Sequence, residues 1–209
     1  MAAIPVTISL TNLLTFLSLL SPFFVSFFML LFSIINNNIT KGLIYLSGLL
    51  IVTFINYLLK NILKSTLPIN ASPLCKVLPP PFSVINSGET YVSPSLNTTV
   101  LAFTFSYLVY PMIINNDINP SLLVFLTMFL VINSSVEFMQ KCVDFSGILF
   151  GIILGIICGI LFYMMLHING FEKLAYFTHI DSNAVKCGKP GKQKFKCVSY
   201  KKTTRPASS

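Results

Sequence analysis

The stretch Phe145-Ser-Gly-Ile-Leu-Phe-Gly-Ile-Ile-Leu-Gly-Ile-Ile-Cys-Gly-Ile-Leu-Phe-Tyr-Met-Met-Leu166 decides the fold class of this chain. It contains no charged side chain, and a helix that crosses a bilayer needs about 20 mostly apolar residues. Its glycines recur at every fourth position, so they line one helix face and let a neighbouring backbone approach closely. This pattern predicts a membrane-spanning helix packed against another helix, of the same chain or of a second copy, through Gly147, Gly151, Gly155 and Gly159.

The whole chain has the composition of an integral membrane protein. Of its 209 residues, 54% are hydrophobic and only 10% are charged, and the mean hydropathy is +0.79. A soluble fold with so few charges could not cover its surface. A water-soluble enzyme, a secreted disulfide scaffold and a disordered chain are therefore excluded.

Four more apolar stretches are long enough to cross a membrane. The first of them is not expected to be a cleaved signal peptide, because no basic segment precedes it and no small-residue cleavage site follows. We therefore expect an all-α, polytopic bundle of about five transmembrane helices. The expected layout is an N-terminal segment 1–11, a bundle 12–169 with spans 12–35, 43–63, 98–114, 121–138 and 145–166 and a long proline-rich loop 64–97, and a basic tail 170–209.

Five crossings place the two chain ends on opposite sides of the membrane. Face A is the side of the N-terminus, the 64–97 loop and the turn at 139–144, and face B is the side of the C-terminal tail. The chain has 14 basic against 6 acidic residues, and most of the basic ones lie in the last forty positions. The positive-inside rule makes face B cytoplasmic and face A lumenal or external. We expect a location in the endoplasmic reticulum, another endomembrane or the inner membrane of a virion.

Polar residues gather in three separate segments that all emerge on face A. One follows Lys60 at the end of the second span, one precedes the third span around Ser95, and one ends the fourth span at 133–144. Helix ends at the headgroup region are commonly polar, so these segments indicate a site only if they converge.

The order and spacing of these segments resemble the type 2 phosphatidic acid phosphatase superfamily, particularly its dolichyl-diphosphatase-like members. The first family motif is Lys, six residues and Arg-Pro, and it matches Lys60, Leu67 and Pro68. The second is Pro-Ser-Gly-His or Pro-Ser-Ser-His at the start of a helix, and it matches Pro94, Ser95 and Asn97 with one residue between the last two.

The third family motif is Ser-Arg, five residues, His, three residues and then Asp or Gln, before a glycine-rich helix. Two registers compete for it in this chain. With Ser134 and Ser135 as the first pair, Lys141 takes the histidine position and Phe145 the acidic one. With a shift of one residue, Gln140 takes the histidine position and Asp144 the acidic one.

The resemblance implies a helical bundle that holds a lipid phosphate at the membrane surface and, in active members, hydrolyses it through the third-motif histidine. Positioning and charge neutralisation dominate phosphoryl transfer, so the family's lysine and arginines matter as much as its nucleophile. This chain has neither histidine nor arginine at the matching positions. The histidines and the single arginine of the chain are His167, His179 and Arg205. All three belong to face B, a bilayer thickness of about 30 Å from the polar segments of face A.

We therefore expect a non-catalytic membrane scaffold or lipid-headgroup binder that needs no cofactor or metal. Two alternatives stay open: an active lipid phosphate or polyprenyl-diphosphate phosphatase with unusual residues, and a structural protein of a viral or organellar membrane. The expected partners are membrane lipids, a lipid phosphate and a membrane-protein assembly. Nucleic acid is not expected, because no nucleic-acid-binding fold is visible. The candidates for headgroup binding are Lys60, Lys64, Ser95 and Lys141.

The five cysteines do not form a scaffold pattern. Cys75 and Cys142 both belong to face A and can pair if that side is oxidising. Cys158 lies inside a span and is expected to pack there. Cys187 and Cys197 are too sparse for a zinc site without further ligands.

Two sequons lie on face A, Asn70-Ala-Ser72 and Asn97-Thr-Thr99. Either asparagine is a candidate for N-glycosylation. Asn97 lies very close to the membrane, so Asn70 is the better acceptor.

Overall fold

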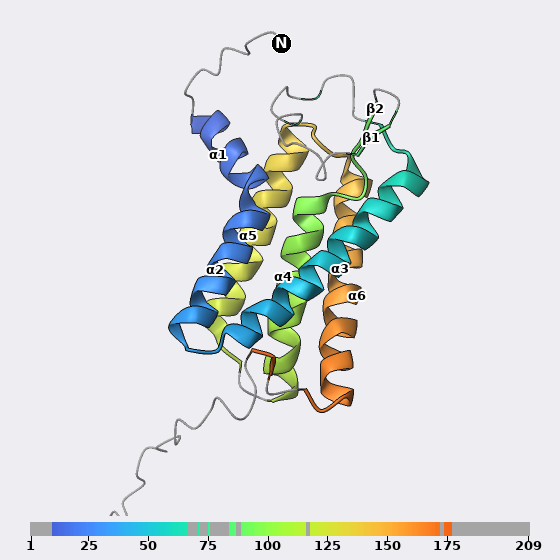
Figure 1. Ribbon diagram of the computed structural model, residues 1–209. Helices are drawn as coiled ribbons and strands as arrows, with labels where there is room; N and C mark the ends of the chain where they lie inside the picture. The colour runs from blue at the N-terminus through green and yellow to red at the C-terminus, as the bar shows by residue number, and fades with distance from the viewer. Residues whose placement is uncertain are drawn as a thin grey trace, which may run out of the picture.

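A computed structural model describes residues 10–66, 71, 75, 84–86, 89–115, 118–171 and 174–176 of the chain. These residues form a helical bundle with one short hairpin at one end (Figure 1). Four helices, α3 to α6, are long and apolar enough to cross a membrane. The expected all-helical membrane architecture is confirmed at this level. The elements are α1 (Leu10–Leu19), α2 (Ser21–Ile35), α3 (Ile39–Leu63), β1 (Val84–Asn86), β2 (Glu89–Tyr91), α4 (Leu96–Ile114), α5 (Pro120–Met139) and α6 (Phe145–Ile168).

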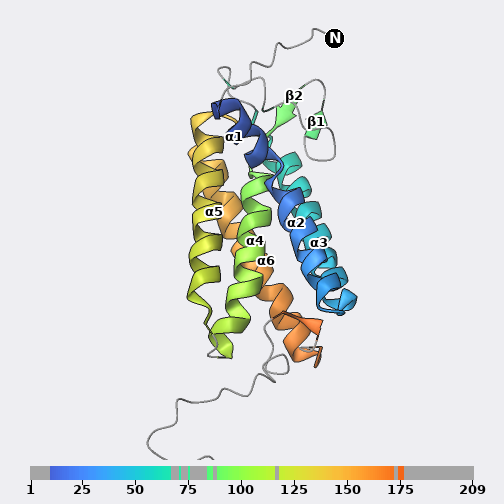
Figure 2. The same ribbon diagram turned by 90° about the vertical axis from the view of Figure 1, so that its left-hand side faces the viewer.

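The structure corrects the first predicted span. Residues 12–35 do not form one helix, because α1 ends at Leu19 and α2 begins at Ser21, and the two helices are inclined to each other (Figure 2). Pro22 explains the break, since it has no N–H for the preceding turn and fits the first turn of a new helix. At 15 residues, α2 is shorter than a full span. The other four predicted spans correspond to α3 to α6.

Helix α4 lies in the centre of the bundle, with α3, α5 and α6 around it (Figures 1 and 2). Most of its side chains are buried. Several of them are Ser or Thr, whose hydroxyls donate to carbonyls one turn earlier, as Thr104 does to Val100 at 2.8 Å. A hydroxyl in hydrocarbon must be satisfied within the protein. The polar character of α4 therefore accounts for its central position.

The glycine face of α6 lies against α4. A methyl group added at Gly151 would lie 2.9 Å from the carbonyl oxygen of Ser95, and one added at Gly155 would lie 2.8 Å from the backbone nitrogen of Phe103. Gly159 lies in the same way against Ser106. The glycines thus permit a close approach of two helices of the same chain.

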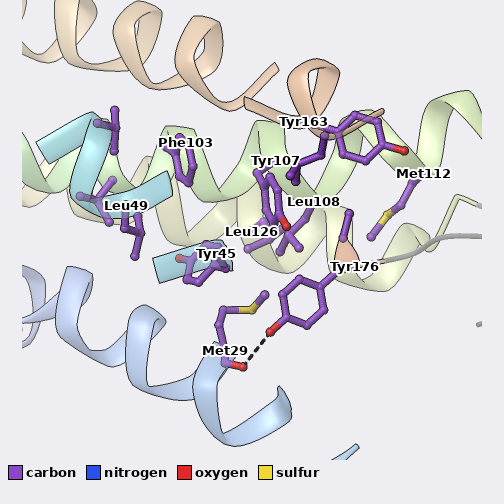
Figure 3. Packing of buried hydrophobic residues seen from close by; sticks show 14 residues of the cluster. Met29, Tyr45, Leu49, Phe103, Tyr107, Leu108, Met112, Leu126, Tyr163 and Tyr176 are labelled. Atoms are coloured by element: carbon purple, nitrogen blue, oxygen red, sulfur yellow. Dashed lines mark hydrogen bonds between the residues drawn. The ribbon is translucent and has the colours of Figure 1, made fainter. Parts of the chain in front are cut away.

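The half of the bundle toward face B has an aromatic core (Figure 3). Tyr107 stacks on Phe103 with a centroid distance of 5.9 Å, and Tyr176 packs edge-on against Tyr107. The Tyr176 hydroxyl also donates to the carbonyl oxygen of Met29 at 3.1 Å. Ala175 and Tyr176, which follow α6, therefore pack against the bundle.

At face A, a small cap joins the end of α3 to the start of α4. Strands β1 and β2 pair antiparallel, Thr66 forms a bridge with Tyr91, and the backbone N–H of Val92 donates to Ser65 at 3.0 Å. Cys75 and Cys142 form a disulfide, which is the pairing that the sequence permits. The cross-link ties the long loop to the turn between α5 and α6.

Candidate functional site

Buried polar side chains converge at the face-A ends of α3, α4 and α5. None of these residues is more than 7% exposed. Polar groups are expensive to bury in hydrocarbon, so such a concentration marks a functional or structural centre. We call this cluster the polar centre and define it as Asn56, Lys60, Ser95, Asn97, Thr98, Thr99 and Glu137.

The carboxylate of Glu137, near the end of α5, sits at the N-terminus of α4. Ser95 is the N-cap of α4, and its hydroxyl accepts from the backbone N–H of Thr98 while it donates to Glu137 Oε2 at 2.6 Å. The Thr98 hydroxyl donates to the same oxygen at 2.9 Å. The N-terminus of a helix attracts anions through its free N–H groups and its dipole. Glu137 therefore occupies a place that suits an anion.

Lys60, near the end of α3, supplies the positive charge of the polar centre. It is 6% exposed and lies close enough to Glu137 for the two opposite charges to interact. Even so, its ammonium makes no hydrogen bond or ion pair of 4.0 Å or less with any described residue. The two charges thus attract each other without direct contact.

Asn56, one helical turn before Lys60, is only partly satisfied. The Thr99 hydroxyl donates to the Ser95 carbonyl oxygen at 2.6 Å, so at its 2.9 Å contact with Asn56 it accepts from Nδ2. This fixes the orientation of the amide, whose Oδ1 is buried and has no hydrogen-bond partner. A buried acceptor of this kind requires an explanation.

A second polar contact holds α1 and α2 against α5. The hydroxyls of Ser18 and Ser21 donate to Asn133 Oδ1 at 2.6 and 3.1 Å. Asn133 lies one turn before Glu137, and its Nδ2 lacks a partner, as does the buried Ser134 hydroxyl. This contact spans the break between α1 and α2 and fixes both short helices to the bundle.

The structure brings together residues of the first and second predicted motifs. Lys60, Ser95 and Asn97 all belong to the polar centre, and Pro94 is buried beside it. The peptide bond between Ser93 and Pro94 is cis. Leu67 and Pro68 lie outside the described residues.

The third predicted motif does not join the polar centre in either register. Gln140 is half-buried, and Lys141, Asp144 and Phe145 are exposed at the turn between α5 and α6. Ser135 is exposed and donates to the Val131 carbonyl oxygen at 2.8 Å. The segment contributes Glu137 to the centre instead.

The four headgroup candidates separate into two pairs. Lys60 and Ser95 are buried in the polar centre, where Ser95 already donates to Glu137. Lys64, which ends α3 with a left-handed φ of 46°, and Lys141 are exposed.

Four members of the polar centre match no motif position, namely Asn56, Thr98, Thr99 and Glu137. A signal for Glu137 exists in the sequence, since it is one of six acidic residues and follows a strongly apolar run. An ionisable side chain inside a predicted span is a reason to suspect a site. Asn56 and Thr98 carry no comparable signal.

The remaining sequence candidates are placed as follows. Asn97 is buried in the first turn of α4, which makes it a poor glycosylation acceptor in the folded chain. Cys158 is a free, half-buried thiol in α6. Asn70, Cys187, Cys197, His179 and Arg205 lie outside the described residues.

The polar centre thus brings together one carboxylate, one ammonium, hydroxyls and amides. Such groups can hold charge and orient polar molecules. In the described part of the chain, no group of three or more His, Cys, Asp and Glu side chains is placed to hold a metal ion. Comparisons of the chain with protein-family models, curated proteins and solved structures give no match.

Proposed function

We propose that this protein is a non-catalytic multi-pass membrane scaffold related to the lipid-phosphatase bundle. The position of Glu137 carries the proposal. The hydroxyls of Ser95 and Thr98 and the start of α4 offer donors that suit an oxyanion, and the Glu137 carboxylate already uses these hydroxyls. A lipid phosphate in the same place would meet like-charge repulsion in a medium of low dielectric constant. In this proposal the Glu137 carboxylate takes the place of a bound phosphate and stabilises the bundle.

The side chains at the nucleophile position support the same proposal. Lys141 is exposed at the turn between α5 and α6 and does not join the polar centre, so it is not placed to attack a phosphorus held by the donors of α4. An amide such as that of Gln140 is not a nucleophile in phosphoryl transfer. Asp144 is exposed at the start of α6, and no hydrogen bond in the described residues links it to the polar centre.

The first prediction is that the purified protein does not hydrolyse lipid phosphates. In nanodiscs supplied with phosphatidic acid or a polyprenyl diphosphate, phosphate release should equal that of empty nanodiscs, because none of the described residues places an activated nucleophile toward the donors of α4. An active lipid phosphatase in the same nanodiscs serves as the positive control.

Other outcomes of this assay favour the alternatives. Release that disappears in Lys141→Ala or Asp144→Ala would establish the enzyme and end the scaffold proposal. Saturable lipid-phosphate binding without release would favour the headgroup binder, for which the exposed Lys64 and Lys141 are suited. Stoichiometric recovery in a larger assembly would favour the structural protein of a viral or organellar membrane.

The proposed orientation places face A in the lumen or outside and the tail in the cytoplasm. Two independent features support it. A disulfide between Cys75 and Cys142 is typical of an oxidising compartment. The sequence after Tyr176 is rich in lysine, Tyr176 packs at the opposite end of the bundle, and cytoplasmic segments are enriched in lysine and arginine. In this arrangement α1 and α2 in series form the fifth crossing.

The second prediction concerns the reactivity of the cysteines in sealed microsomes. A membrane-impermeant PEG-maleimide should label Cys187 and Cys197 from the cytoplasmic side. It should label Cys75 and Cys142 only after permeabilisation and reduction, because they are lumenal and paired. A gel shift measures the labelling, and a Cys187→Ser, Cys197→Ser variant is the matched control. Labelling of Cys75 or Cys142 in sealed vesicles under reducing conditions would reverse the orientation.

A further inference from the structure

The end of α5 joins the disulfide directly to Glu137. Gln140 is the C-cap of α5, and Lys141 follows it with a left-handed φ of 54°. The backbone N–H of Cys142 donates back to the Glu137 carbonyl oxygen at 3.0 Å, and the N–H of Lys141 donates to the next carbonyl oxygen, also at 3.0 Å. These two bonds form a Schellman motif, which closes the last turn of a helix. The residue that is bonded to Cys75 thus also holds the backbone of Glu137.

Glu137 is therefore held at both its backbone and its side chain. Its carbonyl oxygen accepts from Cys142, and its carboxylate accepts from the hydroxyls of Ser95 and Thr98 at 2.6 and 2.9 Å. Successive side chains on a helix differ in direction by about 100°. The carboxylate points toward α4 because the last turn of α5 is wound in this way, so unwinding of that turn would move it.

The disulfide also connects to the start of α4. It closes a covalent ring between Cys75 and Cys142, 67 residues apart in sequence, and the ring contains both α4 and α5. Cys142 is buried in a small apolar cluster against which Cys75 and Val92 pack, and Val92 lies three residues before Ser95. A cross-link that keeps two segments close raises the effective concentration of the groups on them. The disulfide therefore favours the contact that Glu137 makes with α4.

We propose that the redox state of the Cys75–Cys142 pair controls how firmly Glu137 occupies the start of α4. In the reduction, a dithiol gives up two electrons and two protons, the S–S bond breaks, two thiols form, and the dithiol becomes a disulfide. The ring then opens, the cap at Cys142 loosens, and the carboxylate leaves Ser95 and Thr98 more readily. The polar centre is most stable where face A meets an oxidising compartment. The proposal goes beyond the scaffold role and applies whether or not the chain is a scaffold.

The coupling can be measured on the disulfide itself. If docking of Glu137 favours the disulfide, loss of that docking must disfavour the disulfide by the same factor. The full-length protein in nanodiscs is equilibrated with mixtures of reduced and oxidised dithiothreitol, and PEG-maleimide then reports the free thiols by gel shift. The substitutions Cys158→Ala, Cys187→Ser and Cys197→Ser remove the other thiols, so that only the disulfide pair is counted.

Glu137→Ala should lower the equilibrium constant for disulfide formation by about tenfold, a typical size for coupling between two sites. Thr98→Val removes one of the hydroxyls that hold the carboxylate, so it should act in the same direction by a smaller factor. It replaces Glu137→Ala in the test if that variant does not fold. Two control variants should change the constant by less than about twofold. Asp144→Asn removes an exposed acid even closer to Cys142 in the chain, and Tyr45→Phe removes a buried hydrogen bond in the other half of the bundle.

Lys141 tests whether the cap of α5 carries the coupling. Glycine adopts its left-handed conformation without strain, whereas the β-branched side chain of valine opposes it. In a Lys141→Gly background the Glu137→Ala effect should stay near tenfold, and in a Lys141→Val background it should fall below about twofold. A purely structural contribution of Glu137 would give equal effects in the two backgrounds, and that result would overturn the proposal. An unchanged equilibrium in the folded Glu137→Ala or Thr98→Val protein would overturn it as well.

Discussion

Replacing Glu137 with alanine is expected to lower the free energy of unfolding by about 3 kcal/mol. The substitution removes the acceptor shared by the hydroxyls of Ser95 and Thr98. It also leaves the buried Lys60 without the opposite charge that interacts with it. A buried charge without compensation is more destabilising than the loss of a neutral contact. SDS-induced unfolding in mixed micelles measures the change.

Two further substitutions separate charge from packing at this position. Glu137→Gln keeps the size and one acceptor oxygen, so it should be about half as destabilising. Asp144→Asn removes an exposed acid close by in the chain and should change stability by less than about 0.5 kcal/mol.

A double-mutant cycle tests the electrostatic interaction directly. Combined with Lys60→Met, the Glu137→Gln substitution should be less destabilising by about 1 kcal/mol than it is alone. Strict additivity would mean that Lys60 and Glu137 do not interact, and the electrostatic account of the polar centre would then be wrong.

Replacing Gly155 with leucine is expected to destabilise the protein by about 3 kcal/mol, because it forces α4 and α6 apart. A single methyl group at this position already meets the Thr99 carbonyl oxygen and lies 2.8 Å from the backbone nitrogen of Phe103. Backbone atoms of a buried helix cannot rotate away as a side chain can. The higher helix propensity of leucine stabilises the helix by only about 1 kcal/mol relative to glycine. The steric clash is larger, so the substitution lowers the free energy of unfolding. Thermal unfolding and size-exclusion chromatography in detergent measure the result.

Gly147 provides the matched control on the same face of α6. A methyl group there meets only side-chain atoms, Val143 Cγ1 at 2.5 Å and Ser93 at 3.0 Å. Gly147→Ala should therefore be milder than Gly155→Ala. Equal effects of the two alanine substitutions would show that the contact with the α4 backbone does not limit the approach of the helices.

Local sequence features account for much of the helical layout. The apolar runs predict α3 to α6, since a length of about 20 apolar residues is a property of the segment alone. The first predicted span is wrong, because its continuous apolar run contains Pro22, where one helix ends and the next begins. The hairpin β1–β2 was also missed, since its three-residue strands lie in a loop rich in proline.

The candidate site was predicted in part. Lys60, Ser95 and Asn97 do come together, as three polar segments on one face of the bundle suggested. The fourth span, however, contributes Glu137 and not Gln140 or Lys141. Residues 137, 140 and 141 lie within about one helical turn, so a small difference in where α5 ends changes which of them points inward.

Composition and local pattern therefore establish an apolar helical chain, its turns, its basic tail and the glycine face of α6. These properties depend on residues that are neighbours along the chain. The identity of the helix that receives the glycines, the central place of α4 and the meeting of Glu137 with Lys60 come from the folded bundle. They depend on the rotation of each helix about its axis, which is set by packing between segments far apart in the sequence.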